Sequence, residues 1–323
     1  MRTLKQIAAW AFLAPLLLFS CDGETCCDEP VEEIDFTAPT PEAFEALREA
    51  ALNEIVQAAR FNADEGITFT SANGAVLQIP PGCLTLDGAI VFGNVDMEFI
   101  ELYDRAGMLP PNKPTMGRQA DNTKVLLVSG GVFYVNITQD GQQLGNNCLF
   151  QLQVPASLTG GVDPEMSLWT GVFDENNDLT WEPNTNGELL VEGDQYIVFF
   201  NGFGWTNIDR FFNDPRPKTT LLVLVTEGYN AQNASVYLSV DGETTGLAHL
   251  DTFDPETNMF SEHYGQLPIG LEAHLIFVSA EGALWRYAIK PIVVSENQIF
   301  TIAHSETQTA TLADLRALIA ALP

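Results

Sequence analysis

The sequence predicts a mainly β protein made of two antiparallel β-sandwich domains, with a helix before the first and another after the second. Apolar and polar residues alternate over much of the chain, as in Val95, Met97 and Phe99 with Asp96 and Glu98 between them. Such alternation is typical of strands with one buried face, and turn signals such as Asp-Gly separate the runs at short intervals. A length of 323 residues is more than one hydrophobic core usually holds, which predicts two domains.

Residues 1–20 are predicted to be a signal peptide. Arg2 and Lys5 precede an apolar run that is too short to span a bilayer. The run ends at Leu18-Phe19-Ser20-Cys21, which resembles the lipobox of bacterial lipoproteins. The resemblance implies that Cys21 carries acyl chains and that this lipid anchor holds the protein at the outer membrane. The alternative is an ordinary secretory signal that leaves Cys21 as a plain thiol.

Residues 21–40 are acidic and contain prolines, which predicts a flexible tether. Acidic residues directly after the lipobox cysteine resemble the surface-export signal of lipoproteins from the phylum Bacteroidota, and imply display on the cell surface. The whole chain has 14 Lys and Arg against 43 Asp and Glu, a net charge of −29. This charge repels nucleic-acid phosphates, so no nucleic-acid partner is expected. Adaptation to a saline habitat accounts for such an acidic surface better than a dedicated cation-binding function.

The chain contains five cysteines, and four remain if Cys21 is acylated. An oxidising compartment allows three pairings of these four. We favour a disulfide between Cys83 and Cys148, because both fall in one predicted domain and the bond would close a long loop. Cys26 and Cys27 are adjacent in the tether, where they either stay idle, pair with each other or link to another chain.

Residues 41–62 are predicted to form an amphipathic helix. Thr40 is a suitable N-cap and Pro41 suits the first turn. Phe44, Leu47 and later apolar residues recur at spacings of three and four, which places them on one face. We expect this face to pack on the following domain; a partner-binding helix is the alternative.

Residues 63–158 are predicted to form the first sandwich, and they contain a recognisable motif. The run Asn73-Gly74-Ala75-Val76-Leu77-Gln78-Ile79-Pro80-Pro81-Gly82-Cys83-Leu84 resembles the opening of the ZU domain, a β-sandwich of zonula-occludens proteins, netrin receptors and ankyrins. The resemblance implies a domain that binds other proteins. Some animal members cleave themselves at a histidine, but no histidine lies between residues 66 and 158. The residues that carry the motif are Gly74, Ile79, Pro80, Pro81 and Gly82.

Residues 159–214 are predicted to be a connecting β segment rich in aromatic residues. Trp169, Trp181 and Trp205 lie in it. Such side chains either fill the core where two domains meet or, if exposed, stack on sugar rings. Arg210 follows Asp209 directly, and we expect the two to form an internal ion pair.

Asp174, Asn176 and Asp178 have the spacing of a calcium-binding loop. Leu179 stands where such a loop needs glycine, and Thr185 stands where its last acidic ligand belongs. A hairpin turn is therefore the preferred interpretation, with calcium as the alternative.

Residues 215–303 are predicted to form the second sandwich and residues 304–323 a C-terminal helix, with Thr311 and Asp314 as a capping box. Three residues of this part, His249, Asp251 and His263, would be a metal or acid–base set if a loop brought them together. Chance placement near turns is the preferred interpretation.

No catalytic residues are identified, since motifs for a serine nucleophile, a phosphate loop and a zinc protease are missing. The sequence therefore predicts a non-enzymatic lipoprotein without a cofactor, which contacts other envelope or surface proteins. Two alternatives stay open: an accessory lipoprotein that binds or helps degrade glycans, and an adhesin module stabilised by calcium.

Overall fold

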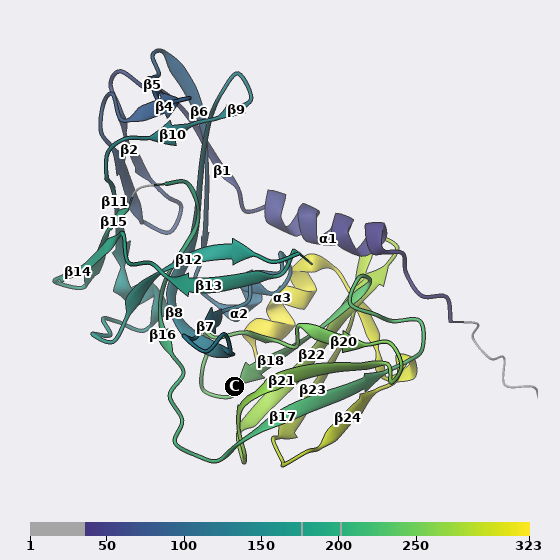
Figure 1. Cartoon of the computed structure of the whole chain (residues 1–323). Helices are drawn as coiled ribbons and strands as arrows, with labels where there is room; N and C mark the ends of the chain where they lie inside the picture. The colour runs from purple at the N-terminus through teal and green to yellow at the C-terminus, as the bar shows by residue number, and fades with distance from the viewer. Residues whose placement is uncertain (1–35, 176, 201) are drawn as a thin grey trace, which may run out of the picture. The chain divides into compact units, whose positions relative to one another are not determined.

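The computed structural model describes residues 36–175, 177–200 and 202–323 (Figure 1). The predicted signal peptide 1–20, the lipidation site Cys21, and Cys26 and Cys27 lie outside the described residues. In the described part the chain is mainly β, and its strands form five sheets.

Strands from the first half of the chain pair only with one another in the described sheets, and so do strands from the second half. The first half contains α1 (Pro41–Asn53), β1 (Gln57–Asn62), β2 (Ile67–Thr70), β3 (Val76–Ile79), β4 (Leu84–Leu86), β5 (Ala89–Ile90), β6 (Asn94–Leu102), α2 (Arg105–Met108), β7 (Met116–Arg118), β8 (Lys124–Gln139), β9 (Gln142–Gln143), β10 (Gly145–Asn146), β11 (Phe150–Pro155), a 3-10 turn (Ala156–Thr159), β12 (Ser167–Phe173), β13 (Leu179–Pro183), β14 (Glu188–Glu192), β15 (Gln195–Phe200) and β16 (Gly204–Phe211).

Two larger sheets of the first half share one hydrophobic core. One runs in the order β1-β6-β8-β16-β12-β13-β7, and the other in the order β14-β15-β11-β3-β2. The alternating residues Val95, Met97 and Phe99 of β6 are buried in the same cluster as Phe150 and Leu152 of β11. The period-two pattern thus sends the apolar side chains of both sheets into one layer.

The predicted helix 41–62 is wrong beyond residue 53. Helix α1 begins at the expected N-cap, where Thr40 accepts a hydrogen bond from the backbone N–H of Ala43, and ends at Asn53. Residues 57–62 form β1, which pairs antiparallel with β6 and buries Phe61. Ile55 and Ala58 continue the apolar spacing of a helix, but the backbone hydrogen bonds between β1 and β6 make residues 57–62 a strand.

The sequence predicts a separate connecting segment at residues 159–214, and this prediction is wrong. Strands β12, β13 and β16 belong to the sheet that contains β8, and β14 and β15 extend the sheet that contains β11. These pairings join distant parts of the chain, as in Gly204 of β16 opposite Val135 of β8. Long-range partners of this kind leave no local signal in the sequence.

The Pro-Pro-Gly segment of the motif forms the turn between β3 and β4. Pro80 and Pro81 follow the last residue of β3, and Gly82 has a left-handed backbone with φ of 67°. Directly after this turn, Cys83 forms a disulfide with Cys148, with their Cα atoms 5.4 Å apart. The disulfide closes a 65-residue separation, so it stabilises this half by about 4 kcal/mol in the chain-entropy account.

The expected ion pair between Asp209 and Arg210 is wrong. Neighbouring residues on a strand point to opposite faces of the sheet. Asp209 is therefore fully buried beside Asn207, whereas Arg210 points the other way and its Nε lies 2.5 Å from Oδ2 of Asp163.

The second half forms two further sheets, in the orders β20-β21-β17-β24 and β19-β18-β22-β23-β25. Their elements are β17 (Lys218–Val225), β18 (Ala234–Val240), β19 (Ala248–His249), β20 (Thr252–Asp254), β21 (Met259–Pro268), β22 (Glu272–Glu281), β23 (Leu284–Val293), β24 (Ile299–Ile302), a 3-10 turn (His304–Glu306), β25 (Gln308–Ala310) and α3 (Leu312–Ala320).

The predicted C-terminal helix 304–323 begins later than expected. Residues 308–310 form β25, which adds an edge strand to β23, and only then does α3 start with Thr311 as its N-cap. Gln308 and Thr309 are polar and exposed, so this short strand gives no apolar alternation in the sequence.

Helix α1 packs against both halves of the chain. Its Phe44 contacts Trp285 of β23 edge to face, with ring centroids 6.0 Å apart. Phe44 also belongs to a cluster that contains Trp169 and Trp181 of the first half. In the part of the chain that the structure describes, no helix has the length and apolar character needed to cross a bilayer.

Candidate functional site

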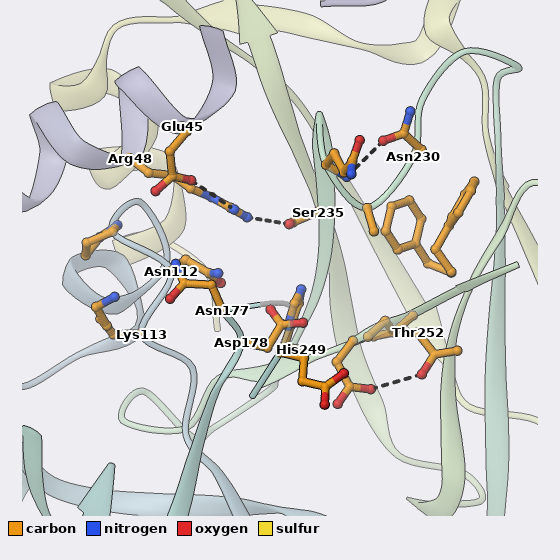
Figure 2. A pocket seen from close by; sticks show the side chains of 18 of the residues that line it. Glu45, Arg48, Asn112, Lys113, Asn177, Asp178, Asn230, Ser235, His249 and Thr252 are labelled. Carbon is orange, nitrogen blue, oxygen red and sulfur yellow. Dashed lines mark hydrogen bonds and ion pairs between the residues drawn. The ribbon is translucent and has the colours of Figure 1, made fainter. Parts of the chain in front are cut away.

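A cleft of about 940 Å³ lies between α1, two loops of the first half and the second half (Figure 2). Its size suits a small ligand or a peptide segment, because ligand pockets of proteins commonly measure roughly 300–1,000 Å³. The side chains that matter most for its chemistry are Arg48, Asn112, Lys113, Asp178, Ser235 and His249.

Lys113 contributes a positive charge that forms no ion pair with any described residue, although the charge of Glu45 acts on it from a greater distance. Its Nζ lies 5.3 Å from the ring centre of Phe173 and 5.0 Å from that of Trp205. Among the described residues, no carboxylate or hydrogen-bond acceptor pairs with this ammonium group. Burial, and to a lesser extent the charge of Arg48, lowers the pKa of Lys113 to about 8, so the side chain is mostly protonated at neutral pH.

The loop after α2 holds Asn112 and Lys113 in place. Asn112 adopts a left-handed backbone with φ of 55°, which ends the helical turn and allows the N–H of Lys113 to bond to the carbonyl of Met108. The Oδ1 of Asn112 accepts a hydrogen bond of 2.5 Å from the hydroxyl of Tyr237. Asn112 lines the cleft, and no described residue accepts a hydrogen bond from its amide Nδ2.

Asp178 projects from the hairpin turn between β12 and β13. The N–H of Asp174 donates to the carbonyl of Asp178, and the N–H of Asp178 donates to Oδ1 of Asp174, which closes the turn. Asn177 has a left-handed backbone with φ of 63°. Burial, followed by the nearby charges of Asp174 and Asp251, raises the pKa of Asp178 to about 6. In the described structure its carboxylate accepts no hydrogen bond.

His249 faces Asp178 from the second half of the chain. It ends β19, opposite Tyr237 of β18, and its ring stacks on Tyr237 with centroids 4.9 Å apart. The Nδ1 of His249 lies 3.7 Å from Oδ1 of Asp178, beyond hydrogen-bond distance. Burial lowers the pKa of His249 to about 4, so the ring is neutral at pH 7.

Arg48 of α1 forms a further part of the wall. Its guanidinium donates a hydrogen bond of 2.6 Å to Ser235 of β18 and lies over the ring of Phe44. Its NH1 atom is 3.7 Å from Glu45. Arg48 is therefore already paired, and it adds positive potential to the cleft without presenting an open group.

Hydrogen-bonding groups of opposite kinds therefore remain open in one cavity. Lys113 and Asn112 present donors, and Figure 2 shows them on one side; Asp178 and His249 lie next to each other. Removing a polar group from water without giving it a hydrogen-bond partner costs free energy. This cost is smallest where a ligand or a water molecule bonds to the group.

The structure describes two of the three residues predicted as a calcium loop, and their side chains approach different partners. Asp174 approaches Lys124 at 3.9 Å, Asp178 faces His249, and Asn176 lies outside the described residues. Across residues 36–175, 177–200 and 202–323, no group of three or more His, Cys, Asp or Glu side chains is arranged to hold a metal ion.

The set of His249, Asp251 and His263 is also divided. Asp251 forms an ion pair of 2.6 Å with Lys124 of β8, and Tyr264 donates to the same carboxylate oxygen. The Nδ1 of His263 is 3.8 Å from Asp251 and is hydrogen-bonded to Thr252 instead. The hydroxyl of Thr252 bonds to both Asp251 and His263, but among the described residues no hydrogen bond joins His249 to them.

The tryptophans of β12, β13 and β16 are buried, whereas Phe173 at the end of β12 is 40% exposed. Trp169, Trp181 and Trp205 are 2%, 0% and 8% exposed. Their indole faces are not open to a sugar ring.

Sequence reasoning missed Asn112 and Lys113. Neither belongs to a motif, and only the three prolines around them at positions 110, 111 and 114 indicate a shaped loop. No protein-family model matches the chain, and no curated protein matches it.

Proposed function

We propose that this chain is a lipid-anchored binding protein of the cell envelope and that the cleft is its binding site. One observation carries the proposal: open polar groups from the loop after α2, the β12–β13 turn and β19 converge on one cavity. A bound ligand would give these groups the partners that the described protein does not supply.

The location in the envelope is supported by the sequence. The lipobox-like run ending at Cys21 and the acidic tether favour a protein held at the outer membrane and displayed outside the cell. We also propose that residues 63–211 form a sandwich of ZU type and that the second half forms another. Both proposals agree with the mainly β structure, and the first extends the predicted domain through β16.

We favour binding over catalysis because the carboxylate and imidazole groups near the cleft are either engaged by other side chains or not oriented by a hydrogen bond. Asp251 is engaged by Lys124 and Tyr264, and His249 makes no hydrogen bond that would orient it as a base. The glycan alternative loses the observation that motivated it, since Trp169 and Trp181 are buried. The calcium alternative gains no support from the β12–β13 hairpin turn, because its Asp174 approaches Lys124 and its Asp178 faces His249.

The anchor is tested by labelling the native host with radioactive or clickable palmitate. We expect the wild-type chain to incorporate the label and Cys21→Ser to lose it and leave the membrane fraction. A Cys26→Ser variant is the matched control, because it removes a neighbouring tether thiol and keeps the lipobox cysteine. Equal labelling of wild type and Cys21→Ser would refute the anchor.

The cleft is tested by photo-cross-linking in the native envelope. A photoreactive residue at Gln232, which lines the cleft, is expected to capture a ligand or partner. The same residue at Gln143, exposed on β9, is the control. Lys113→Met should weaken capture at Gln232. Capture that is equal at both positions and unaffected by Lys113→Met would refute the cleft as the binding site.

A further inference from the structure

We infer that the ligand of the cleft is a short peptide or amino acid in zwitterionic form, with its carboxylate at Lys113 and Asn112 and its ammonium group at Asp178. This inference rests on the proposed binding function and adds the chemical class of the ligand.

The carboxylate end is defined by donors for which the described residues supply no acceptor. The ammonium of Lys113 offers three N–H groups, and the amide Nδ2 of Asn112 offers two. The hydroxyl of Tyr237 occupies Oδ1 of Asn112, so this residue presents donors rather than an acceptor to the cleft. In a chain with 43 acidic residues, the half-buried ammonium of Lys113 lies over the rings of Phe173 and Trp205 and forms no ion pair among the described residues, although the charge of Glu45 acts on it. Such a group is suited to bind an anion.

The ammonium end is defined by an acceptor to which no residue of the described part donates a side-chain hydrogen bond. Asp178 is ionised at pH 7, and its side chain is 18% exposed within the cleft. His249 beside it is neutral, so it does not neutralise the carboxylate. An ionised, mostly buried carboxylate favours a cation, and an ammonium group supplies both charge and hydrogen-bond donors.

The charged residues that line the cleft disfavour ligands that carry several charges of one sign. A phosphate ester would meet Lys113 favourably but would be repelled by the acidic residues around it. A polycation would meet the reverse problem at Lys113 and Arg48. A ligand with one charge of each sign satisfies both ends. The acidic residues that line the cleft are Glu45, Glu49, Glu175, Asp178 and Asp251.

The inference is tested by calorimetric titration with alanine peptides of two to four residues. Each peptide is used in three forms: free, acetylated at the N-terminus, and amidated at the C-terminus. We expect the free form to bind and each cap to weaken binding by about 10- to 100-fold, the range for a hydrogen bond to a charged group. The length that binds best reports the separation of the two charged sites.

Two variants assign each end of the ligand to its residue. Asp178→Asn should bind free and acetylated peptides equally, and Lys113→Met should bind free and amidated peptides equally. Lys290→Met is the control, since Lys290 lies on β23 and bonds to Thr301 and Glu306 outside the cleft. Thermal unfolding of each variant verifies that it is folded.

The possible outcomes distinguish an error in the proposed ligand class from an error in the proposed binding site. Equal binding of capped and free peptides to the wild-type protein would overturn the zwitterionic assignment and leave the cleft as a binding site. The absence of binding by every free peptide at millimolar concentration would also overturn the inference. The cross-linking experiment at Gln232 decides the proposed function independently, because it assumes no ligand class.

Discussion

The buried imidazole of His249 makes the stability of the fold depend on pH in a defined direction. Burial lowers the pKa of His249 to about 4 from an ordinary value of 6.5. Below pH 6.5 the unfolded chain therefore binds a proton at this position that the folded chain does not bind. Stability is lost as the pH falls through this window, and the loss is complete near pH 4.

The size of the effect follows from the two pKa values. The difference between 6.5 and about 4 corresponds to about 3 kcal/mol of folding free energy. Asp178 acts in the opposite sense, because burial raises its pKa to about 6 and the folded chain gains a proton there first. The wild-type curve alone combines both groups, so the contribution of His249 must be isolated with a variant.

The assay is urea unfolding of wild type and His249→Gln at a series of pH values from 7.5 to 4. We expect the stability of the wild type relative to His249→Gln to fall by about 3 kcal/mol across this range. His263→Gln is the matched control, since that side chain is 47% exposed. A constant difference between wild type and His249→Gln at all pH values would refute the reasoning that His249 is buried and neutral.

Three further predictions concern buried groups outside the cleft. Arg105→Met should lower the free energy of unfolding by about 3 kcal/mol in urea titrations, because the buried guanidinium donates to Ser239 and to backbone carbonyls; an unchanged midpoint would contradict this. Replacing Cys83 and Cys148 together by serine should cost about 4 kcal/mol, and reductant should destabilise the wild type but not this variant. Burial raises the pKa of Asp209 well above its ordinary value, so the stability of wild type relative to Asp209→Asn should fall as the pH rises from about 4. A difference between the two proteins that stays constant over pH 4–7 would oppose it.

The β character of the chain was predictable because apolar and polar residues alternate along strands that bury one face. Val95, Met97 and Phe99 alternate with acidic residues, and the structure buries all three. The end of α1 was not predictable in this way, because Ile55 and Ala58 continue the helical spacing while backbone bonds to β6 make residues 57–62 a strand. The pattern within a segment cannot report a partner that lies forty residues away.

Single residues of the candidate site could be noticed in the sequence, but their partners in the fold could not. The sequence pointed to Asp178 and His249 with other partners: Asp178 as one of three calcium-loop residues, and His249 with Asp251 and His263. The fold instead brings them to 3.7 Å from each other. Lys113 belongs to no motif, and its significance comes only from the lack of an acidic partner among the described residues.

Native mass spectrometry of the protein purified from its own membranes tests the central claim most directly. If the cleft binds a ligand, the wild-type protein should carry an additional small-molecule mass that is released on unfolding. Lys113→Met should lose most of this mass, and Lys290→Met should retain it. A wild-type protein without any bound mass, or a bound mass that Lys113→Met retains in full, would contradict the account.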